Sequence, residues 1–384
     1  MIKIFLTADN HFGRKFDRYP IKDIIIANRY DSFEKMIKKA NEEKCNFFVI
    51  AGDLFENTNN IATTDVKKVI DYLKKFEGNV LVLPGNHDYY TGEEMIWKTF
   101  EKNIEGIENI TLLKEYKEYK YEVGEEAVVF FPAYCDAKHS DENKLSAYKD
   151  YNFDDNDFNV LIAHGAIEGK SVDNEGKYFL MAERELNNMG VDCCLIGHMH
   201  VPYPENLKEE EYTKGYKVFN AGTHSQLDLH NNTDGECFII ELSGIGENKE
   251  VKAKKYCSGE LRFYDLNVDI YNNNLKESVK KSLDNIATDD KKKVIVRINV
   301  NGSISTDEYE KKEDIYNELL GDYLYGDKED KDLVEQITMD KIKKEFAETS
   351  FASQLLERLS DNPIEQRITY DLIKEAMSNE NKRD

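Results

Sequence analysis

Five short motifs in this sequence carry side chains of the kinds that bind divalent metal ions. In chain order they are Asp9-Asn10-His11, Gly52-Asp53-Leu54-Phe55, Gly85-Asn86-His87-Asp88, His164-Gly165 and Gly197-His198-Met199-His200. Five of the eight histidines in the chain lie in these motifs. Imidazole together with carboxylate oxygen favours Mn, Fe, Zn or similar ions, and the absence of a nearby cysteine argues against a closed structural zinc site. The motifs therefore predict a site for divalent metal ions.

The residue types also indicate how two ions could share this site. D-x-H and H-x-H each place two side chains on one side of an extended strand end. Asp53 can bridge two ions because a carboxylate has two oxygens, and Asn86 supplies a neutral amide oxygen. The predicted metal ligands are Asp9, His11, Asp53, Asn86, His164, His198 and His200. Two ions about 3.5–4 Å apart activate water and neutralise a phosphate together, so we expect phosphoester hydrolysis.

His87 and Asp88 are the predicted catalytic residues beside the metals. His87 follows the predicted ligand Asn86 and is expected to face the substrate, where it could donate to the transition state or protonate the leaving oxygen. Asp88 could orient His87, or it could simply cap a turn. The glycines of the second, third and fifth motifs are expected to let the backbone turn sharply beside the ligands. Of the three histidines outside the motifs, His224 is expected to lie nearest the site.

Each motif directly follows a short apolar run of the kind that forms a buried strand. The runs that precede the motifs are Ile2–Ala8, Phe47–Ala51, Val80–Leu83, Val160–Ala163 and Cys193–Ile196. Amphipathic segments, among them Phe33–Ala40 and Val66–Leu73, separate such runs up to about residue 243. This alternation predicts an α/β domain over residues 1–243. Loops at the carboxyl ends of its strands would converge on one crevice and bring the ligands together.

The remainder of the chain is predicted to form two smaller parts. Residues 250–325 are expected to be a small α/β capping domain, because two alternating strands, Leu266–Ile270 and Val294–Val300, flank a helical stripe. Gly326–Asp332 is predicted to be a charged linker. Residues 333–384 are predicted to be helices that cannot close a core alone. Their apolar face, formed by Phe351, Leu355, Leu356 and Leu359, is expected to bind a partner.

Composition narrows the class of protein. A chain of 384 residues suggests two or three domains. The formal net charge of -23 argues against a simple DNA-binding module, although a nuclease could borrow a basic surface from a partner. No apolar run approaches the roughly 18 residues of a membrane helix. The six cysteines show no C-x-x-C spacing and are expected to be free thiols in the cytoplasm.

The order of the motifs resembles that of the calcineurin-type metallophosphoesterase superfamily and, within it, the SbcD-type DNA-repair exonucleases. The sequence G-D-L-F at Gly52–Phe55 is typical of that branch. Asn220–Thr223, with Gly235–Phe238 downstream, resembles the strands that end the branch's catalytic domain. The layout of a catalytic domain, a small cap and C-terminal helices is similar too.

The resemblance implies a four-layer α/β/β/α sandwich with a small βαβ cap domain and C-terminal helices. It assigns Asp9, His11, Asp53 and His200 to one metal, and Asp53, Asn86, His164 and His198 to the other, and it gives His87 a catalytic role. It further implies Mn²⁺ as the cofactor and exonuclease or endonuclease activity on DNA in repair and recombination. A homodimer is implied, as is a partnership in which the C-terminal helices bind the coiled coil of an SMC-like, SbcC-type ATPase.

Two other functions remain open at this point. The chain could be a metallophosphoesterase for a small phosphodiester or phosphomonoester, which the acidic net charge favours. It could also be a non-catalytic adaptor that docks an ATPase, although the complete ligand set argues against that. One departure from the branch's pattern concerns DNA handling: several relatives have a histidine directly after G-D-L-F, where this chain has Glu56, and the Pro-Ser that often follows is absent from Asn57–Ile61.

Overall fold

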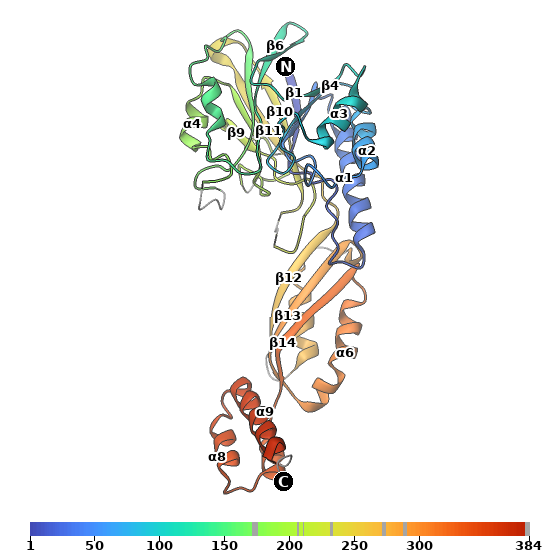
Figure 1. The fold of residues 1–384 in the computed structure, drawn as a ribbon, viewed down its shortest axis with the longest axis vertical. Helices are drawn as coiled ribbons and strands as arrows, with labels where there is room; N and C mark the ends of the chain where they lie inside the picture. The colour runs from blue at the N-terminus through green and yellow to red at the C-terminus, as the bar shows by residue number, and fades with distance from the viewer. Residues whose placement is uncertain are drawn as a thin grey trace. The chain divides into compact units, whose positions relative to one another are not determined.

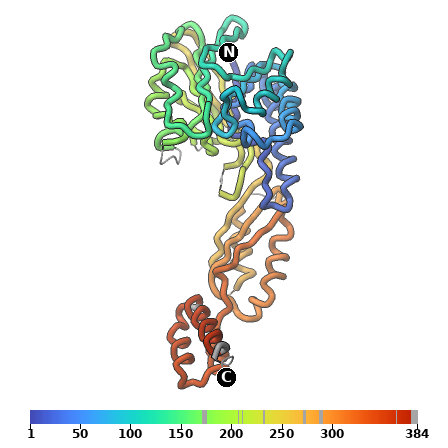
Figure 2. Tube along the Cα trace, viewed as in Figure 1, coloured from blue at the N-terminus to red at the C-terminus, as the bar shows by residue number. Residues whose placement is uncertain are grey.

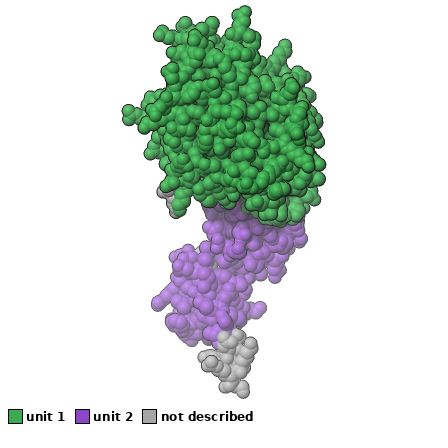
Figure 3. All heavy atoms as spheres, turned by 45° about the horizontal axis from the view of Figure 1, so that its top comes forward, with its two compact units in different colours: residues 1–261 green, residues 262–384 purple. Residues whose placement is uncertain are grey.

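The computed structural model describes residues 1–170, 176–205, 207–209, 211–230, 233–270, 274–286 and 290–380. The chain divides into two compact units, Met1–Leu261 and Arg262–Asp384, which Figure 3 colours green and purple. The unit boundary follows strand β11 (Glu250–Cys257).

The first unit contains two sheets whose central strands are parallel. One has the order β11-β10-β1-β2-β3-β4, with β1 to β4 parallel and with β10 and β11 antiparallel. The other has the order β5-β6-β7-β8-β9, with β6 to β9 parallel. The strands of the first sheet are β1 (Ile2–Thr7), β2 (Phe47–Ala51), β3 (Asn79–Leu83), β4 (Ile110–Leu112), β10 (Glu236–Ser243) and β11. Those of the second are β5 (Tyr119–Val123), β6 (Glu126–Ala133), β7 (Phe158–His164), β8 (Cys193–Gly197) and β9 (Val218–Asn220).

The two sheets pack face to face and are covered on their outer sides by helices, as Figure 1 shows. Ile4 and Val49 of the first sheet meet Phe130 and Ile162 of the second in the central core. Three helices, α1 (Lys22–Glu42), α2 (Thr63–Leu73) and α3 (Met95–Ile104), bury their apolar faces on the first sheet. Helix α4 (Glu183–Asn188) and the 3₁₀ helix η1 (Lys144–Tyr148) cover the second. This is the predicted four-layer α/β/β/α sandwich, and both sheets are buried on two faces, as parallel sheets require.

The predicted start of the second domain at residue 250 is wrong. Strand β11 pairs with β10 along its whole length, from Glu236↔Cys257 to Ser243↔Glu250. Its sequence looked like a polar connection because it is an edge strand whose lysines point to carboxylates. Lys254 lies 3.2 Å from Glu43 and Lys255 lies 2.7 Å from Glu236, while only Ala253 is fully buried. Lysine-rich edges of this kind discourage pairing with other chains.

The second unit begins with a three-stranded parallel sheet of order β12-β13-β14. Its strands are β12 (Arg262–Asp269), β13 (Val294–Ile304) and β14 (Tyr325–Glu335), and its helices are α5 (Leu275–Leu283) and α6 (Thr306–Leu320). The predicted βαβ unit is present, and Figure 2 traces the chain on through α6 into β14. Val296, Ile298, Leu275 and Val279 lie in its core. The 3₁₀ helix η3 (Lys291–Lys293) directly precedes β13, whereas the other short 3₁₀ helix, η2 (Gly246–Asn248), connects β10 and β11 in the first unit.

The charged linker predicted at Gly326–Asp332 is instead the middle of β14. The strand carries few apolar residues because its charges pair with helix α6. Lys328 contacts Glu313, and Asp330 lies 2.9 Å from Lys312. Leu333 supplies the strand's buried apolar side chain. The sequence of this edge strand shows no alternation of apolar and polar residues, because ion pairs rather than hydrophobic contacts cover it.

The C-terminal helices also differ from the prediction. They are α7 (Met339–Glu345), α8 (Phe351–Arg358) and α9 (Pro363–Glu380), and they form a small core of their own. Leu356 is fully buried there against Ile342, Phe346 and Tyr370. The predicted apolar face of α8 is therefore divided, because Leu356 points inward whereas Phe351 is 79% exposed.

Candidate metal centre

All seven predicted ligands lie at the carboxyl ends of parallel strands, and these strands come from both sheets. Asp9 and His11 follow β1, Asp53 follows β2, and Asn86 follows β3 of the first sheet. His164 ends β7, and His198 and His200 follow β8 of the second sheet. The sequence predicted five strand ends, and the pairing of the two sheets brings these ends to one crevice.

The backbone at several ligands adopts the left-handed conformation that side-chain-bearing residues rarely use. The φ angles are 51° at Asp9, 48° at His11, 52° at Asp53 and 101° at His198. The loops after β1 and β2 hold one another by backbone hydrogen bonds, in which Asp9 donates to Gly52 at 3.1 Å and His11 donates to Asp53 at 3.0 Å. Unfavourable backbone of this kind persists where surrounding contacts enforce it, and it is concentrated at functional sites.

The motif glycines are needed mainly for close approach. A Cβ at Gly52 would lie 2.0 Å from Nδ1 of His164, and one at Gly85 would lie 2.2 Å from Oδ1 of Asp53. A Cβ at Gly197 would lie 2.0 Å from the carbonyl oxygen of Ala51. Of these three glycines, only Gly52 has a positive φ, at 94°. Sharp turning, the predicted reason, therefore applies to Gly52, whereas the other two make room for the ligands.

Among the described residues, three groups bring their ligand atoms within 4.8 Å of one another. They are Asp9 with His11 and His200, His11 with Asp53 and His87, and Asp9 with Asp53 and His164. Asp9, His11 and Asp53 each belong to two of these groups, and Oδ2 of Asp53 lies 3.4 Å from Nε2 of His164. Nε2 of His11 lies 3.2 Å from Nε2 of His200.

Asn86 and His198 complete the second half of the site. Oδ1 of Asn86 lies 3.0 Å from both Nε2 of His164 and Nδ1 of His198. The backbone N–H of His198 donates to both carboxylate oxygens of Asp9, at 3.1 and 3.0 Å, which ties the loop after β8 to the loop after β1. The side chain of His198 thus lies with Asn86 and His164, whereas its backbone holds Asp9.

The donor atoms fit a cation. Nδ1 of His164 lies 2.8 Å from the carbonyl oxygen of Ala51, which can only accept, so Nδ1 carries the hydrogen. In the neutral ring, Nε2 is then an acceptor, yet it faces two further acceptors, Oδ1 of Asn86 and Oδ2 of Asp53. Acceptors that converge in a buried site need a positive charge between them or a proton on the ring. The same negative surroundings raise the pKa of His164 to about 9, although burial opposes this.

Burial and neighbouring charges set the other ionisation states. Burial raises the pKa of Asp9 well above its ordinary value, and burial lowers the pKa of His11. Burial also raises the pKa of Asp53, but the charge of His164 and the hydrogen bond with it outweigh burial and hold the pKa of this carboxyl well below its usual range. A neutral His11 and an ionised Asp53 are the forms that bind metals.

Of the two roles predicted for Asp88, the structure supports the role in the turn rather than an orienting contact with His87. The two oxygens of Asp88 accept backbone N–H groups of Gly85 at 2.7 Å and Phe55 at 2.9 Å, so this fully buried carboxylate shapes the loops after β2 and β3. Burial, and then the charge of Asp53, raise the pKa of Asp88 to about 7. His87 is held instead by the backbone carbonyl of Glu56, 3.0 Å from its Nδ1.

Arg29, which the sequence did not single out, and His224 both contact Asn10 of the first motif. Arg29 of α1 is buried, and it donates to the carbonyl oxygens of Asn10 at 2.5 Å and Ser225 at 3.0 Å. His224 is buried as well, 3.1 Å from the side-chain amide of Asn10, so it lies behind the predicted ligands rather than among them. Burial lowers the pKa of Arg29 to about 9. The sequence signal that could have identified Arg29 is its position, as a charged residue, on the apolar face of the helix α1.

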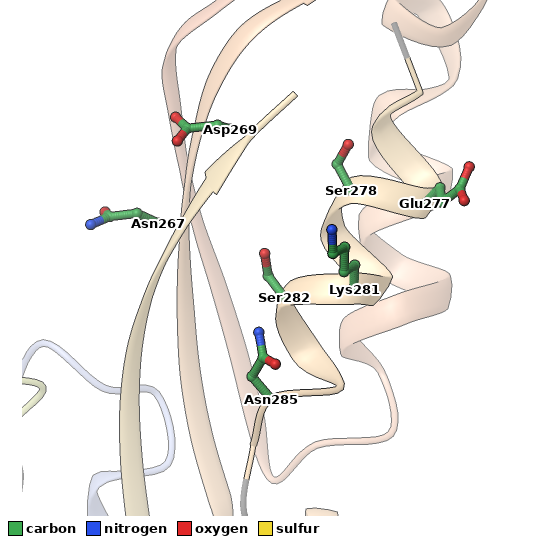
Figure 4. Close-up of a pocket in the computed structure, with 7 residues that line it drawn as sticks. All are labelled: Asn267, Asp269, Glu277, Ser278, Lys281, Ser282 and Asn285. Atoms are coloured by element: carbon green, nitrogen blue, oxygen red, sulfur yellow. The ribbon is translucent and has the colours of Figure 1, made fainter. Parts of the chain in front are cut away.

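The second unit contains a cavity of a different kind, shown in Figure 4. It has a volume of about 380 Å³ and lies between β12, which contributes Asn267 and Asp269, and α5, which contributes Lys281 and Asn285. It brings no histidine to its lining. We therefore place the candidate metal centre in the first unit. None of the described helices combines the length and apolarity needed to cross a membrane.

Comparison with known proteins gives one family and several distant relatives. The family model described as calcineurin-like phosphoesterase matches residues 2–202, more than half of the 384 residues. The uncharacterized metallophosphoesterase YhaO of Bacillus subtilis (strain 168) is 28% identical over 223 residues, which cover 53% of this chain and 52% of that protein. The chain therefore spans about half the length of this curated relative.

Among solved structures, a novel archaeal phosphodiesterase is 13% identical, with 66% of this chain and 100% of that one covered and a TM-score of 0.31. A dimetal phosphatase from Danio rerio is 11% identical, with coverage of 66% and 98% and a TM-score of 0.37. The E. coli phosphoesterase Yfce is 10% identical, with coverage of 62% and 88% and a TM-score of 0.25.

Proposed function

The chain belongs to the calcineurin-like phosphoesterase family, and from this premise we propose that it is a two-metal nuclease of the SbcD type that hydrolyses phosphodiester bonds in DNA. As a family member it is a metal-dependent phosphoester hydrolase. The observation that carries the proposal is the convergence of acceptor atoms from both sheets on one buried crevice. The seven residues Asp9, His11, Asp53, Asn86, His164, His198 and His200 would hold two Mn²⁺ ions.

The residues of this site have separate tasks in the proposed reaction. When bound, the metal pair supplies an activated water and positive charge for the phosphoryl oxygens. Asp53 would bridge the pair, and its Oδ1 also accepts the backbone N–H of His87 at 2.8 Å. The carbonyl of Glu56 keeps a hydrogen on Nδ1 of His87, so Nε2 is the nitrogen that can hold a second proton. From there His87 would protonate the leaving oxygen or stabilise the charge on the phosphoryl group.

One observation favours a nucleic-acid substrate over a small ester. A cavity of about 520 Å³ lies beside the site, and its lining includes His198 and His200 together with Lys170, Tyr203 and Glu205. Its size is typical of small-ligand pockets, so the volume alone fits a small ester as well as a nucleotide. Lys170 lies 4.9 Å from the Tyr203 ring, and a cation beside an aromatic ring suits a phosphate and a stacked base. The net charge of -23 favours the alternative, a small phosphodiester or phosphomonoester.

Digestion of linear duplex DNA beside bis-nitrophenyl phosphate tests the substrate. We expect Mn²⁺-dependent cleavage of both, because the small ester needs the metal centre alone, and we expect chelator to abolish both activities until Mn²⁺ is restored. Cleavage of the ester without cleavage of DNA would favour the small-substrate alternative. Full activity after exhaustive chelation, with no metal left in the protein, would remove the metal-dependent mechanism itself.

The proposed partner is a coiled-coil ATPase of the SbcC type, bound through the C-terminal helices. Ile364, Ile368 and Leu372 recur every four residues on α9 and are 38%, 54% and 61% exposed. Residues at this spacing share one helical face, and exposed apolar faces mark partner surfaces. We also propose a homodimer, to be tested by sedimentation of the purified chain.

Charge on this face is expected to disrupt partner binding while it leaves catalysis intact. The variant Ile368→Glu/Leu372→Glu should weaken binding to the ATPase coiled coil by at least about 10-fold, since buried apolar anchors dominate interface energies. Substitution is preferable to deletion of residues 333–384, because that cut would remove buried Leu333 and the end of β14. Binding can be measured by calorimetry, with Ile245→Glu as a control at a residue that is 75% exposed in the first unit. Unchanged binding by the double variant would show that α9 does not contact this partner.

A further inference from the structure

Glu56 occupies a position between two histidines of the candidate site. Its carboxylate Oε2 lies 3.0 Å from Nδ1 of His11, on the side of the ring opposite Nε2. Both atoms are buried, and neither makes an aligned hydrogen bond with a described residue, because the 3.0 Å contact between them does not have hydrogen-bond geometry. Arg14 lies 4.0 Å from the same oxygen.

The backbone of Glu56 contacts the same region. Its N–H donates to the carbonyl of Phe12 at 3.0 Å, which fixes the residue beside the first motif. Its carbonyl accepts Nδ1–H of His87 at 3.0 Å. The rings of His11 and His87 are 4.8 Å apart and nearly perpendicular, at 88°. Glu56 therefore reaches one histidine through its side chain and the other through its main chain.

We propose that the Glu56 carboxylate is a positioning residue for His11. By accepting Nδ1–H it would fix the ring tautomer in which Nε2 is unprotonated and faces Nε2 of His200 and Oδ2 of Asp53. A carboxylate behind a metal-binding imidazole also increases the basicity of the ligand nitrogen, and its loss weakens metal affinity. This inference rests on the proposed role of His11 as a metal ligand.

Glu56 contacts His11 through its side chain and His87 through its main chain, so a substitution can separate the two contacts. Substitution of Glu56 removes the contact with His11 but keeps the carbonyl that holds His87. A defect caused by weak metal binding should therefore be overcome by a higher metal concentration. A defect in the catalytic role of His87 should not be.

The test is calorimetric titration of Mn²⁺ into the metal-stripped full-length protein. We expect Glu56→Ala to raise the Kd for Mn²⁺ about 10- to 100-fold. Glu56→Gln, whose amide oxygen can still accept Nδ1–H, should have a smaller effect, and saturating Mn²⁺ should restore the cleavage rate of both variants. Asp228→Asn is the matched control, because Asp228, like Glu56, lies near Arg14, at 3.5 Å, and no contact with His11 or His87 is found for it among the described residues.

Wild-type Mn²⁺ affinity in Glu56→Ala would overturn the inference, as would an equal loss of affinity in Asp228→Asn, which would indicate a general effect of charge. If Glu56→Ala fails to fold, the affinity of Glu56→Gln for Mn²⁺ decides. Wild-type affinity is expected if an oxygen acceptor at this position suffices. A loss of affinity equal to that caused by removing His11 would contradict the proposal. If the wild-type protein binds no Mn²⁺, the proposed metal site fails instead, and the two failures are thereby distinguished.

Discussion

Replacement of Asp53 by alanine is expected to abolish metal binding and to lower phosphodiester cleavage by about 10⁴-fold or more, the scale of losses when residues that act as a unit are removed. Asp53 is fully buried, and its Oδ2 lies near the ligand nitrogens of both His164, at 3.4 Å, and His11, at 3.8 Å. The change removes a negative charge that both ions would share, so neither half of the site should hold its metal.

Metal stoichiometry and cleavage rate, measured on the same preparation, check this result. Asp53→Asn is the informative companion variant, because it keeps the shape and the hydrogen bond from the His87 backbone but removes the charge. Loss of metal in both variants would identify charge as the cause. Retention of two ions by Asp53→Ala would show that Asp53 is not a bridging ligand.

Replacement of His87 by alanine is expected to separate catalysis from metal binding. His87 shares a group of ligand-capable atoms with His11 and Asp53, so the geometry also permits it to bind metal. Under the proposed role, His87→Ala should retain both ions and cleave DNA about 10²- to 10⁴-fold more slowly, as is typical when a general acid or base is lost. Loss of a metal, or cleavage at the wild-type rate, would show that this role is wrong.

The choice of substrate then distinguishes two roles for the ring. If His87 protonates the leaving oxygen, a nitrophenyl ester should suffer much less than DNA, because nitrophenolate leaves without a proton. If His87 stabilises charge on the phosphoryl oxygens, both substrates should be affected alike. Added Mn²⁺ should not rescue either activity, in contrast to the behaviour expected of Glu56→Ala.

The sequence was sufficient to predict the class of the fold and to select side chains that the structure brings together. The apolar runs before the five motifs are continuous because both sheets are buried on two faces, and buried parallel strands have that pattern. Ligand side chains directly after such runs must lie at the carboxyl ends of strands. The residue types by themselves, carboxylate, imidazole and amide, then indicated a divalent metal centre.

Tertiary structure alone decided which side chains touch. Nε2 of His11 and Nε2 of His200 lie 3.2 Å apart although 189 residues separate them in the chain, because the sheets that carry them pack face to face. Within the first sheet, the neighbouring ends of β2 and β3 bring Asp88 to the backbone N–H groups of Gly85 and Phe55, and they bring the carbonyl of Glu56 to His87. Strands β11 and β14 were missed because ion pairs cover these edge strands, and such pairs leave no apolar period in the sequence. The hydrophobic pattern of a sequence segment indicates which face of one helix or strand is buried. The contacts described here depend instead on how separate helices and strands pack together.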